Sequence, residues 1–247
     1  EVFIFCMKNL DILVTTTEFN MNSWKKALKE KNIKVIYRII ENTAGELFEI
    51  YDPNKVDSDK NKLTIGFSGR YCEWKNWPLA LEIVKRSNDI LGDKLNVKMT
   101  IGCLDNKSTV QANIMFSELK RELGDRFNGI INATMKEMDE FYYGVDIFIL
   151  TSKFNTESFG RTLVEAMSRG TAVLTTNAGG PVEVVGDSRN VCKDADEFVE
   201  RIMSLYNDRN LLKLEKSNNL ERVKEKYSLK NNINKHLDIY KFIECNT

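Results

Sequence analysis

Short apolar runs alternate with amphipathic segments from residue 63 to the C-terminus. The runs are rich in Val, Ile and Phe, which favour buried strands. We predict strands at residues 63–68, 97–102, 129–133, 146–151 and 172–176. Strands that alternate with helices form a parallel sheet covered on both faces. The pattern therefore predicts an α/β fold with a doubly wound parallel sheet.

Helices are predicted between these strands. Asn76 can cap one helix, with Pro78 in its first turn. Another helix begins at Phe159 or Gly160 and ends near Arg169, where Gly170 suits the C′ position. Two or three helices follow Asp194. The remaining predicted helices span residues 108–123, 136–143 and, last in the chain, 229–243.

The first fifth of the chain has its own pattern. Residues 11–17 and 33–40 are β-rich, and residues 22–31 have a helical pattern, which together indicate one β-α-β unit. Residues 51–62 are polar, without periodicity, and are typical of a linker. We therefore divide the chain into three parts, at residues 1–50, 51–62 and 63–247. The apolar opening, without an initiator Met, suggests a fragment of a longer protein.

Composition excludes several classes of protein. The 36 basic and 36 acidic residues cancel, which argues against a nucleic-acid partner. The five cysteines form no C-x-x-C pair and their count is odd, as expected in a reducing compartment. No apolar run has the length of a membrane span, and the apolar segment at residues 1–7 is too short for a signal peptide and lacks a basic start. We therefore expect a cytoplasmic protein.

The most informative stretch runs from Glu157 to Glu165. The two carboxylates lie eight positions apart, and a Ser-Phe-Gly turn between them opens an apolar helix. The first NH groups of a helix are unpaired and carry partial positive charge, which suits a phosphate. At 1.5 Å per residue the stretch spans at most about 12 Å. That is roughly the reach from a sugar ring across a diphosphate to a ribose.

Arg70 and Lys75 follow the first strand of the predicted larger sheet. Ligands of doubly wound sheets bind outside the carboxyl ends of the strands. Arg70 could meet a diphosphate as a planar fork and Lys75 as a point charge. The simpler explanation is an exposed Arg and Lys on a loop that enters a helix. Their placement at a strand end favours a functional role.

The two glutamates also have a simpler explanation. An acidic residue near a helix N-terminus is favoured by the helix dipole, which accounts for Glu157. A solvated helix face accounts poorly for Glu165, because its neighbours are apolar. Glu165 is therefore predicted to be partly buried and to need polar partners.

This arrangement resembles the retaining nucleotide-sugar glycosyltransferases of family 4. The matching features occur in the family's order: Gly69-Arg70 with Lys75, the strand that begins at Asp146, the paired glutamates, and Gly179-Gly180-Pro181-Val182-Glu183. The resemblance covers about residues 40–240. It implies the GT-B fold, made of two Rossmann-like domains, of which this chain holds the C-terminal, donor-binding one and a remnant of the other.

The resemblance also implies roles for individual residues. Glu157 would contact hydroxyls of the transferred sugar, and Arg70 and Lys75 would neutralise the departing nucleoside diphosphate. Glu165 would hold the ribose hydroxyls. The backbone amides of Arg161 and Thr162 would meet the phosphates. The whole predicted donor-binding set is Glu165, Ser158, Phe159, Gly160, Arg161, Thr162 and, as weak candidates for the base, Asn132 and Ala133.

We expect neither a metal site nor a cofactor; the donor substrate is a nucleoside diphosphate sugar. Two stretches have the DxD spelling of metal-dependent glycosyltransferases, but Asp57-Ser58-Asp59 lies in the polar linker and Asp194-Ala195-Asp196 heads a helix. Both are interpreted as turn and cap residues. Asp57 also begins an imitation of a calcium loop, which lacks the required Gly and closing Glu. His236 is the single histidine and is predicted to lie at the surface.

The acceptor would be a glycan, a lipid or a small molecule bound by a domain that this chain lacks, and that domain could touch a membrane. The predicted activity is therefore a retaining, hexosyltransferase-like glycosyl transfer in polysaccharide or glycoconjugate synthesis. Two alternatives stay open. One is a module that binds nucleotide sugars without catalysis. The other is a phosphoacceptor regulator, which is disfavoured because Gly69-Arg70 stands where its acidic cluster belongs.

Overall fold

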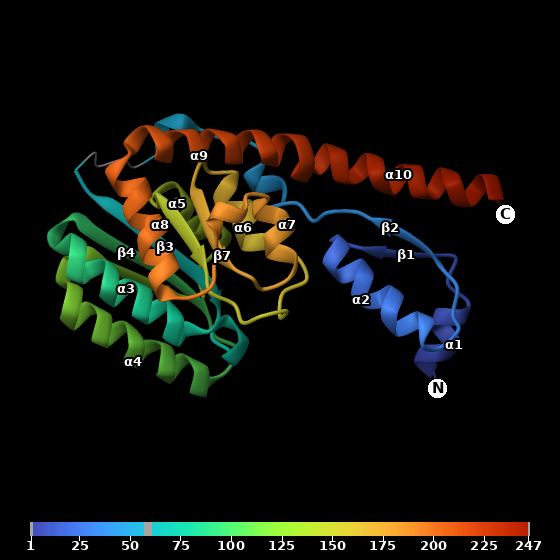
Figure 1. Cartoon of the computed structure of the whole chain (residues 1–247), viewed down its shortest axis with the longest axis horizontal. Coiled ribbons are helices and arrows are strands. Elements are labelled where there is room, and N and C mark those ends of the chain that lie inside the picture. Colours follow the sequence, from blue (N-terminus) through green and yellow to red (C-terminus); the bar gives the residue numbers. More distant parts are fainter. Residues whose placement is uncertain (1, 57–60, 247) are drawn as a thin grey trace.

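The computed structural model describes residues 2–56 and 61–246, and in these residues two parallel sheets form (Figure 1). The larger sheet has the strand order β5-β4-β3-β6-β7-β8. The chain builds outward from β3 to β5 and then returns to the other side of β3, so the order reverses between β3 and β6. The strands are β3 Leu63–Arg70, β4 Leu95–Gly102, β5 Phe127–Ile131, β6 Ile147–Leu150, β7 Ala172–Thr176 and β8 Val191–Cys192.

Helices cover both faces of the larger sheet. One core cluster packs α3, α4 and α8 against the strands, and a second packs α5, α6 and α7 against the opposite face. This is the doubly wound arrangement that the sequence predicts. The helices are α3 Trp77–Leu91, α4 Asn106–Leu123, α5 Met135–Tyr143, α6 Arg161–Met167, α7 Gly180–Val185, α8 Ala195–Asn207 and α9 Arg209–Arg222.

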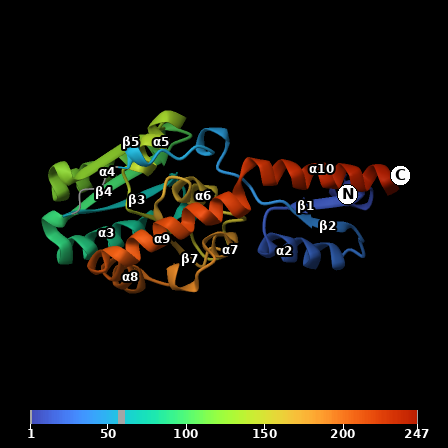
Figure 2. The same cartoon turned by 90° about the horizontal axis from the view of Figure 1, so that it is seen from above.

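The smaller sheet pairs β1 Ile12–Thr15 with β2 Ile36–Ile39 in parallel. The helix α2 Glu18–Lys29 joins the two strands, as the predicted β-α-β unit requires, and α1 Val2–Lys8 precedes them. The last helix, α10 Leu229–Asn246, leaves the larger sheet and runs alongside β1 and β2 (Figures 1 and 2). Its residue Ile239 packs with Ile12 and Ile40 in a small apolar cluster. Among the described residues, no helix combines the length and apolar character needed to cross a bilayer.

Several element boundaries differ from the predictions for local reasons. The helix α2 begins four residues early because the Thr17 side chain accepts a hydrogen bond from the Asn20 amide and so caps it. The helix α7 and the strand β8 were not predicted, being only six and two residues long. Gly170 adopts φ +67°, as its predicted position after the helix requires.

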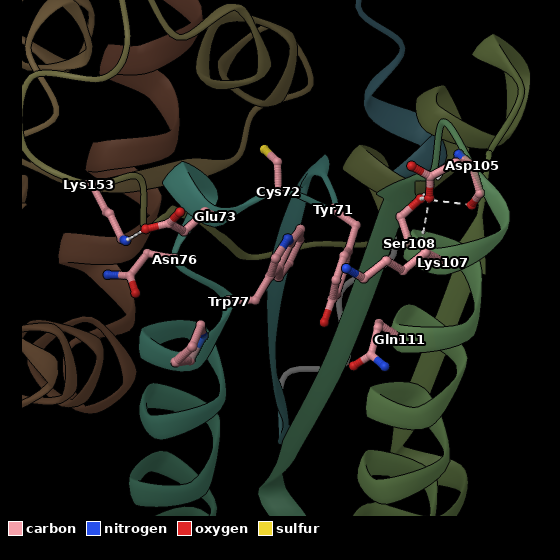
Figure 3. Close-up of a pocket in the computed structure, with 11 residues that line it drawn as sticks. Tyr71, Cys72, Glu73, Asn76, Trp77, Asp105, Lys107, Ser108, Gln111 and Lys153 are labelled. Atoms are coloured by element: carbon pink, nitrogen blue, oxygen red, sulfur yellow. Dashed lines mark hydrogen bonds and ion pairs between the residues drawn. The ribbon is translucent and has the colours of Figure 1, made fainter.

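The structure corrects the prediction that the Asn76 side chain caps α3. The residue precedes α3 but adopts φ +52° and ψ +50°, and its side chain caps no backbone amide. A short 3-10 helix, Glu73–Lys75, ends at Asn76 in the left-handed region, which Asn tolerates better than most residues. Asn76 instead lines a cavity described below, on the side of Lys153 (Figure 3).

Arg169 fixes the segment that joins the two sheets. Its guanidinium pairs with Asp139, and both side chains are buried. The same group donates hydrogen bonds to the carbonyls of Phe48 and Ile50 at 3.1 Å and of Leu47 at 2.7 Å. One buried cation therefore satisfies a carboxylate and three backbone acceptors.

Replacing Arg169 with Met should lower the free energy of unfolding by about 3 to 5 kcal/mol, because the buried Asp139 would keep only the 56% exposed Lys55 as a partner and the backbone carbonyls would lose their donor. Urea unfolding followed by circular dichroism measures this. The matched control is Arg189→Met, whose side chain is 64% exposed and pairs with Asp187. That change should cost less than about 1 kcal/mol. Equal losses in the two variants would contradict the anchoring role of Arg169.

Candidate active site

A cavity of about 530 Å³ opens at the carboxyl edge of the larger sheet. It lies near the point where the strand order reverses, between β3 and β6. Doubly wound sheets bind their ligands at such a point. Six of the predicted site residues line it: Arg70, Lys75, Asn132, Ala133, Glu157 and Thr162. Residues that follow three separate strands, β3, β5 and β6, thus meet at one point with the first turn of α6.

Lys75 and Glu157 form an ion pair inside this cavity. The Lys75 Nζ lies 2.6 Å from the Glu157 Oε1, and the two side chains are 12% and 18% exposed. The buried Ser152 donates its hydroxyl to the same oxygen at 2.8 Å. Lys75 and Ser152 both contact Oε1, and neither of them contacts the second carboxylate oxygen, Oε2. Glu157 is therefore oriented through one oxygen.

The backbone of Glu157 is also fixed. Its NH donates to the Ala178 carbonyl and its carbonyl accepts from the Gly180 NH, both at 3.0 Å. A Cβ added to Gly180 would lie 2.1 Å from the Ser158 oxygen, far inside van der Waals contact. Only glycine allows this approach, which holds the turn before α6 against the loop that follows β7.

The turn then enters α6 through Gly160, at φ +92° and ψ +56°. A helix begins at Arg161, so the amides of Arg161 and Thr162 belong to its first turn and have no intrahelical acceptor. The Phe159 side chain is buried and packs edge-on against Tyr227. Its ring therefore supports the turn and is not available to a ligand. Ser158 is exposed, and its carbonyl accepts a hydrogen bond from the Thr17 hydroxyl of the smaller sheet at 2.8 Å.

Glu165 is buried on α6 and has the polar partners that its apolar neighbours predict. Tyr142 donates its hydroxyl to Oε2 at 2.8 Å, and the Arg161 Nε lies 3.0 Å from Oε1. Burial raises the pKa of the Glu165 carboxyl, while Tyr142 and Arg161 oppose the rise. Tyr142 is fully buried, and that burial raises its pKa well above the ordinary range. Tyr142 therefore serves as a neutral donor.

The remaining predicted residues lie at the rim. The exposed Arg70 guanidinium stacks over the Trp74 ring at 5.3 Å, and both residues line the cavity. Asn132 adopts φ +54°, and its side-chain oxygen accepts from the Cys103 amide at 2.7 Å. The carboxamide of Asn132 thus already braces the loop after β4. Ala133 lines the cavity without a polar side chain.

The two DxD stretches have different outcomes. Asp194 caps α8 by accepting a hydrogen bond from the Glu197 amide, as predicted. Asp57-Ser58-Asp59 lies outside the described residues. Within residues 2–56 and 61–246, no three His, Cys, Asp or Glu side chains gather as they would around a metal ion. His236, on α10, is partly exposed and contacts the Asn232 carbonyl at 2.9 Å.

Two contributors to the site are absent from the sequence prediction: Ser152 and Tyr142 orient the two glutamates. Gly180, which the sequence analysis names within the double-glycine stretch, permits the close approach of the two loops. A tyrosine in an apolar helix face needs a partner for its hydroxyl, which is a signal that could have indicated Tyr142. Ser152 follows the strand β6 directly, a position where polar side chains reach the site.

Comparisons with known proteins identify the family of the chain. The model of the family described as "Glycosyl transferases group 1" matches residues 50–226. The capsular polysaccharide biosynthesis glycosyltransferase CapM of Staphylococcus aureus is 26% identical over 194 residues, which are 74% of this chain and 48% of that protein. The chain spans about half the length of the curated relatives it matches.

Solved structures show the same fold. The C-terminal domain of a group 1 glycosyl transferase, LpcC of Francisella tularensis, superposes with a TM-score of 0.58 at 20% identity, covering 68% of this chain and 87% of that one. HepE of Anabaena, solved with UDP and glucose, gives a TM-score of 0.72 at 15% identity over 95% of this chain and 63% of that one. The α/β fold with a parallel sheet is therefore that of a GT-B C-terminal domain.

The raised pKa of Glu165 predicts a pH-dependent stability. An acid whose pKa is higher in the folded state costs stability when it ionises, so the cost is absent below the unfolded pKa of roughly 4.3 and grows above it. Glu165→Gln keeps the shape and removes the charge. The variant should therefore gain stability relative to the unchanged protein as the pH rises from 4 to 8, as measured by urea unfolding.

Glu137→Gln is a control of opposite sign. The hydrogen bond from the Thr134 amide lowers the pKa of the exposed Glu137 carboxyl, so this variant should lose relative stability as the pH rises. The burial argument would be contradicted if the stability of Glu165→Gln, relative to the unchanged protein, stayed constant or fell as the pH rises.

Proposed function

The chain belongs to the glycosyl transferases group 1 family, and from this premise we propose that it transfers a sugar, with retention of configuration, from a nucleoside diphosphate to an acceptor hydroxyl. Residues 63–247 would bind the donor. Residues 1–50 would belong to the acceptor-binding side, with residues 51–62 as the link. One observation carries the proposal: Lys75, Glu157 and the first turn of α6 converge on one cavity.

The charges in this cavity suit a diphosphate that is attached to a sugar. Arg70 and Lys75 outnumber Glu157, so the lining has a positive excess beside the helix N-terminus. Backbone amides and cations placed in advance stabilise negative charge that grows on a departing phosphate. The acceptor hydroxyl is the nucleophile in such a transfer. The main task of the protein is then to orient the donor and to receive the charge.

The Lys75–Glu157 pair would divide its tasks once the donor arrives. Lys75 Nζ has three protons and can bind a phosphate oxygen while it keeps Glu157. The Glu157 oxygen that Ser152 and Lys75 leave open can accept hydrogen bonds from sugar hydroxyls. The phosphate would therefore lie against Lys75 and the sugar against Glu157. The bond between sugar and phosphate would then break beside this ion pair.

Glu165 would hold the ribose at the other end of the turn. Tyr142 and Arg161 fix its two oxygens, and such a rigid carboxylate can accept from two neighbouring hydroxyls. Because HepE was solved with UDP and glucose, uridine diphosphate is the first nucleotide to test. CapM acts in capsular polysaccharide biosynthesis, so a glycan is the acceptor class to test first.

Calorimetric titration with uridine diphosphate tests the diphosphate role of Lys75. Lys75→Ala should weaken binding by about 1 to 3 kcal/mol, the scale of a charge-assisted hydrogen bond. The matched control is Lys120→Ala, whose ammonium pairs with the exposed Asp125 far from the cavity. Affinity should also survive excess chelator, because protein cations and amides supply the positive charge. Unchanged affinity in Lys75→Ala, or a large loss restored by Mg²⁺ or Mn²⁺, would overturn this account.

The two glutamates should differ in kinetics. Glu165 contacts the ribose before and during reaction, so Glu165→Ala should chiefly weaken nucleotide binding. Glu157 lies at the transferred sugar, so Glu157→Gln should lower kcat more than it raises KM. Both are measured by release of nucleoside diphosphate in a preparation that includes the acceptor-binding domain. Intact turnover in Glu157→Gln would contradict the role of Glu157 at the transferred sugar. No turnover in the unchanged protein, with nucleotide binding intact, would leave a module that binds without catalysis.

A further inference from the structure

A second cavity, of about 490 Å³, opens between the first turns of α3 and α4 (Figure 3). It shares a wall with the donor cavity, the short 3-10 helix Glu73–Lys75. Trp74 and Lys75 of this helix line the donor cavity, whereas Glu73 and the preceding Cys72 line the second one. The two cavities are therefore neighbours along the carboxyl edge of the sheet.

The charges around the second cavity are already satisfied. Glu73 and Lys153 pair with each other at 2.6 Å across one rim. Asp105 accepts from the Ser108 amide at 2.7 Å and is used as the cap of α4. With Lys107, the described residues that line the cavity include two acids and two bases, so their formal charges cancel. Burial raises the pKa of the Cys72 thiol, which keeps it neutral. A neutral ligand fits this lining better than a phosphate does.

The other side chains combine apolar surfaces with uncharged polar groups. Tyr71 lies between the two helices, the 6% exposed Trp77 forms the floor of the cavity, and Pro78 adds an aliphatic ring. The Trp77 indole donates to the Arg70 carbonyl at 3.1 Å, which fixes its ring. Gln111 lines the cavity from α4, whereas the Asn76 carboxamide lies on the side of Lys153 (Figure 3). Each carboxamide offers two donors and an acceptor with two lone pairs.

This combination matches a sugar ring. A pyranose has apolar C–H faces, which lie against aromatic and aliphatic rings, and a rim of hydroxyls, which need both donors and acceptors. The volume falls in the range of about 300 to 1,000 Å³ that is usual for small-molecule sites. The donor cavity beside it has instead a positive excess and fits the diphosphate.

We propose that the cavity between α3 and α4 binds a neutral sugar residue of the acceptor glycan, held by the rings of Tyr71 and Pro78 and by the carboxamide of Gln111, above the buried Trp77. The identity of this glycan as the acceptor rests on the proposed function; the binding itself does not. A glycan seated here extends past the helix Glu73–Lys75 toward Glu157. The donor-binding half of the protein thus contributes to acceptor choice.

The three tryptophans of the chain provide the test. Trp77 lines the second cavity, Trp74 lines the donor cavity, and Trp24 lies on α2 in the smaller sheet. In a ¹⁵N-labelled protein, their indole NH resonances report each place separately. Methyl α-D-glucopyranoside, methyl α-D-mannopyranoside and maltose should shift the Trp77 resonance and leave that of Trp24 unchanged. Uridine diphosphate should shift the Trp74 resonance.

Variants distinguish the site from general binding. Gln111→Ala, at an exposed helix position, should weaken the response of Trp77 to the best sugar about fivefold, the loss of roughly one neutral hydrogen bond. The control is Asn113→Ala, on the same helix but outside the cavity lining, which should change nothing.

The possible results separate the two proposals. Sugars that shift only Trp74, or no tryptophan, overturn the second site and leave the donor site standing. A Trp77 resonance that responds to adenosine or to inorganic pyrophosphate but to none of the sugars also overturns it. A sugar response at Trp77 with no response of Trp74 to uridine diphosphate supports the second site and contradicts the proposed nucleotide site.

Discussion

The turn that carries Glu157 depends on two backbone hydrogen bonds to the loop after β7. These bonds require the Gly180 backbone to lie against the Ser158 carbonyl, at a separation that no side chain permits. The turn then fixes where α6 begins and where Glu157 meets Lys75. The loops after β3, β6 and β7 all converge here. The close contact between Gly180 and Ser158 therefore sets the geometry of the cavity. Glu157 lies between β6 and α6, outside both elements, so this contact holds its backbone in place.

The two glutamates of the site are held by different physical means. Glu157 is partly exposed and neutralised by an ammonium, so its charge is stable in place. Glu165 is buried and receives a neutral hydroxyl and an exposed guanidinium, which together do not offset the loss of solvation. If Glu165 binds the ribose as proposed, the ribose hydroxyls would supply further donors to its carboxylate, so the burial that disfavours the charged form in the free protein would favour binding.

The sequence predicts the parts of this structure that depend on local pattern. The strands of the larger sheet, the burial of Glu165 and the cap at Asp194 all follow from near neighbours in the chain. What it does not predict depends on contacts between distant segments. The Tyr142 hydroxyl reaches Glu165 from another helix, and the Asn132 carboxamide braces the Cys103 amide. Asn76 is a residue type that often caps helices, but its backbone is left-handed and its side chain caps no amide. The preceding 3-10 helix, which ends at Asn76, sets this φ angle.

The hydrogen bonds between α2 and the larger sheet have a mechanical consequence. Glu183 accepts from the amides of Glu18 and Phe19 at 2.9 and 2.6 Å, and Thr17 reaches the Ser158 carbonyl. The two amides meet the two oxygens of one carboxylate, and a hydrogen bond to a charged group contributes about 1.5 to 3 kcal/mol. The cluster of Ile239 with Ile12 and Ile40 adds apolar contact, which has no preferred direction. The first turn of α2 is therefore tied by directional bonds to the turn that holds Glu157, so a displacement of α2 would act on the backbone next to Glu157.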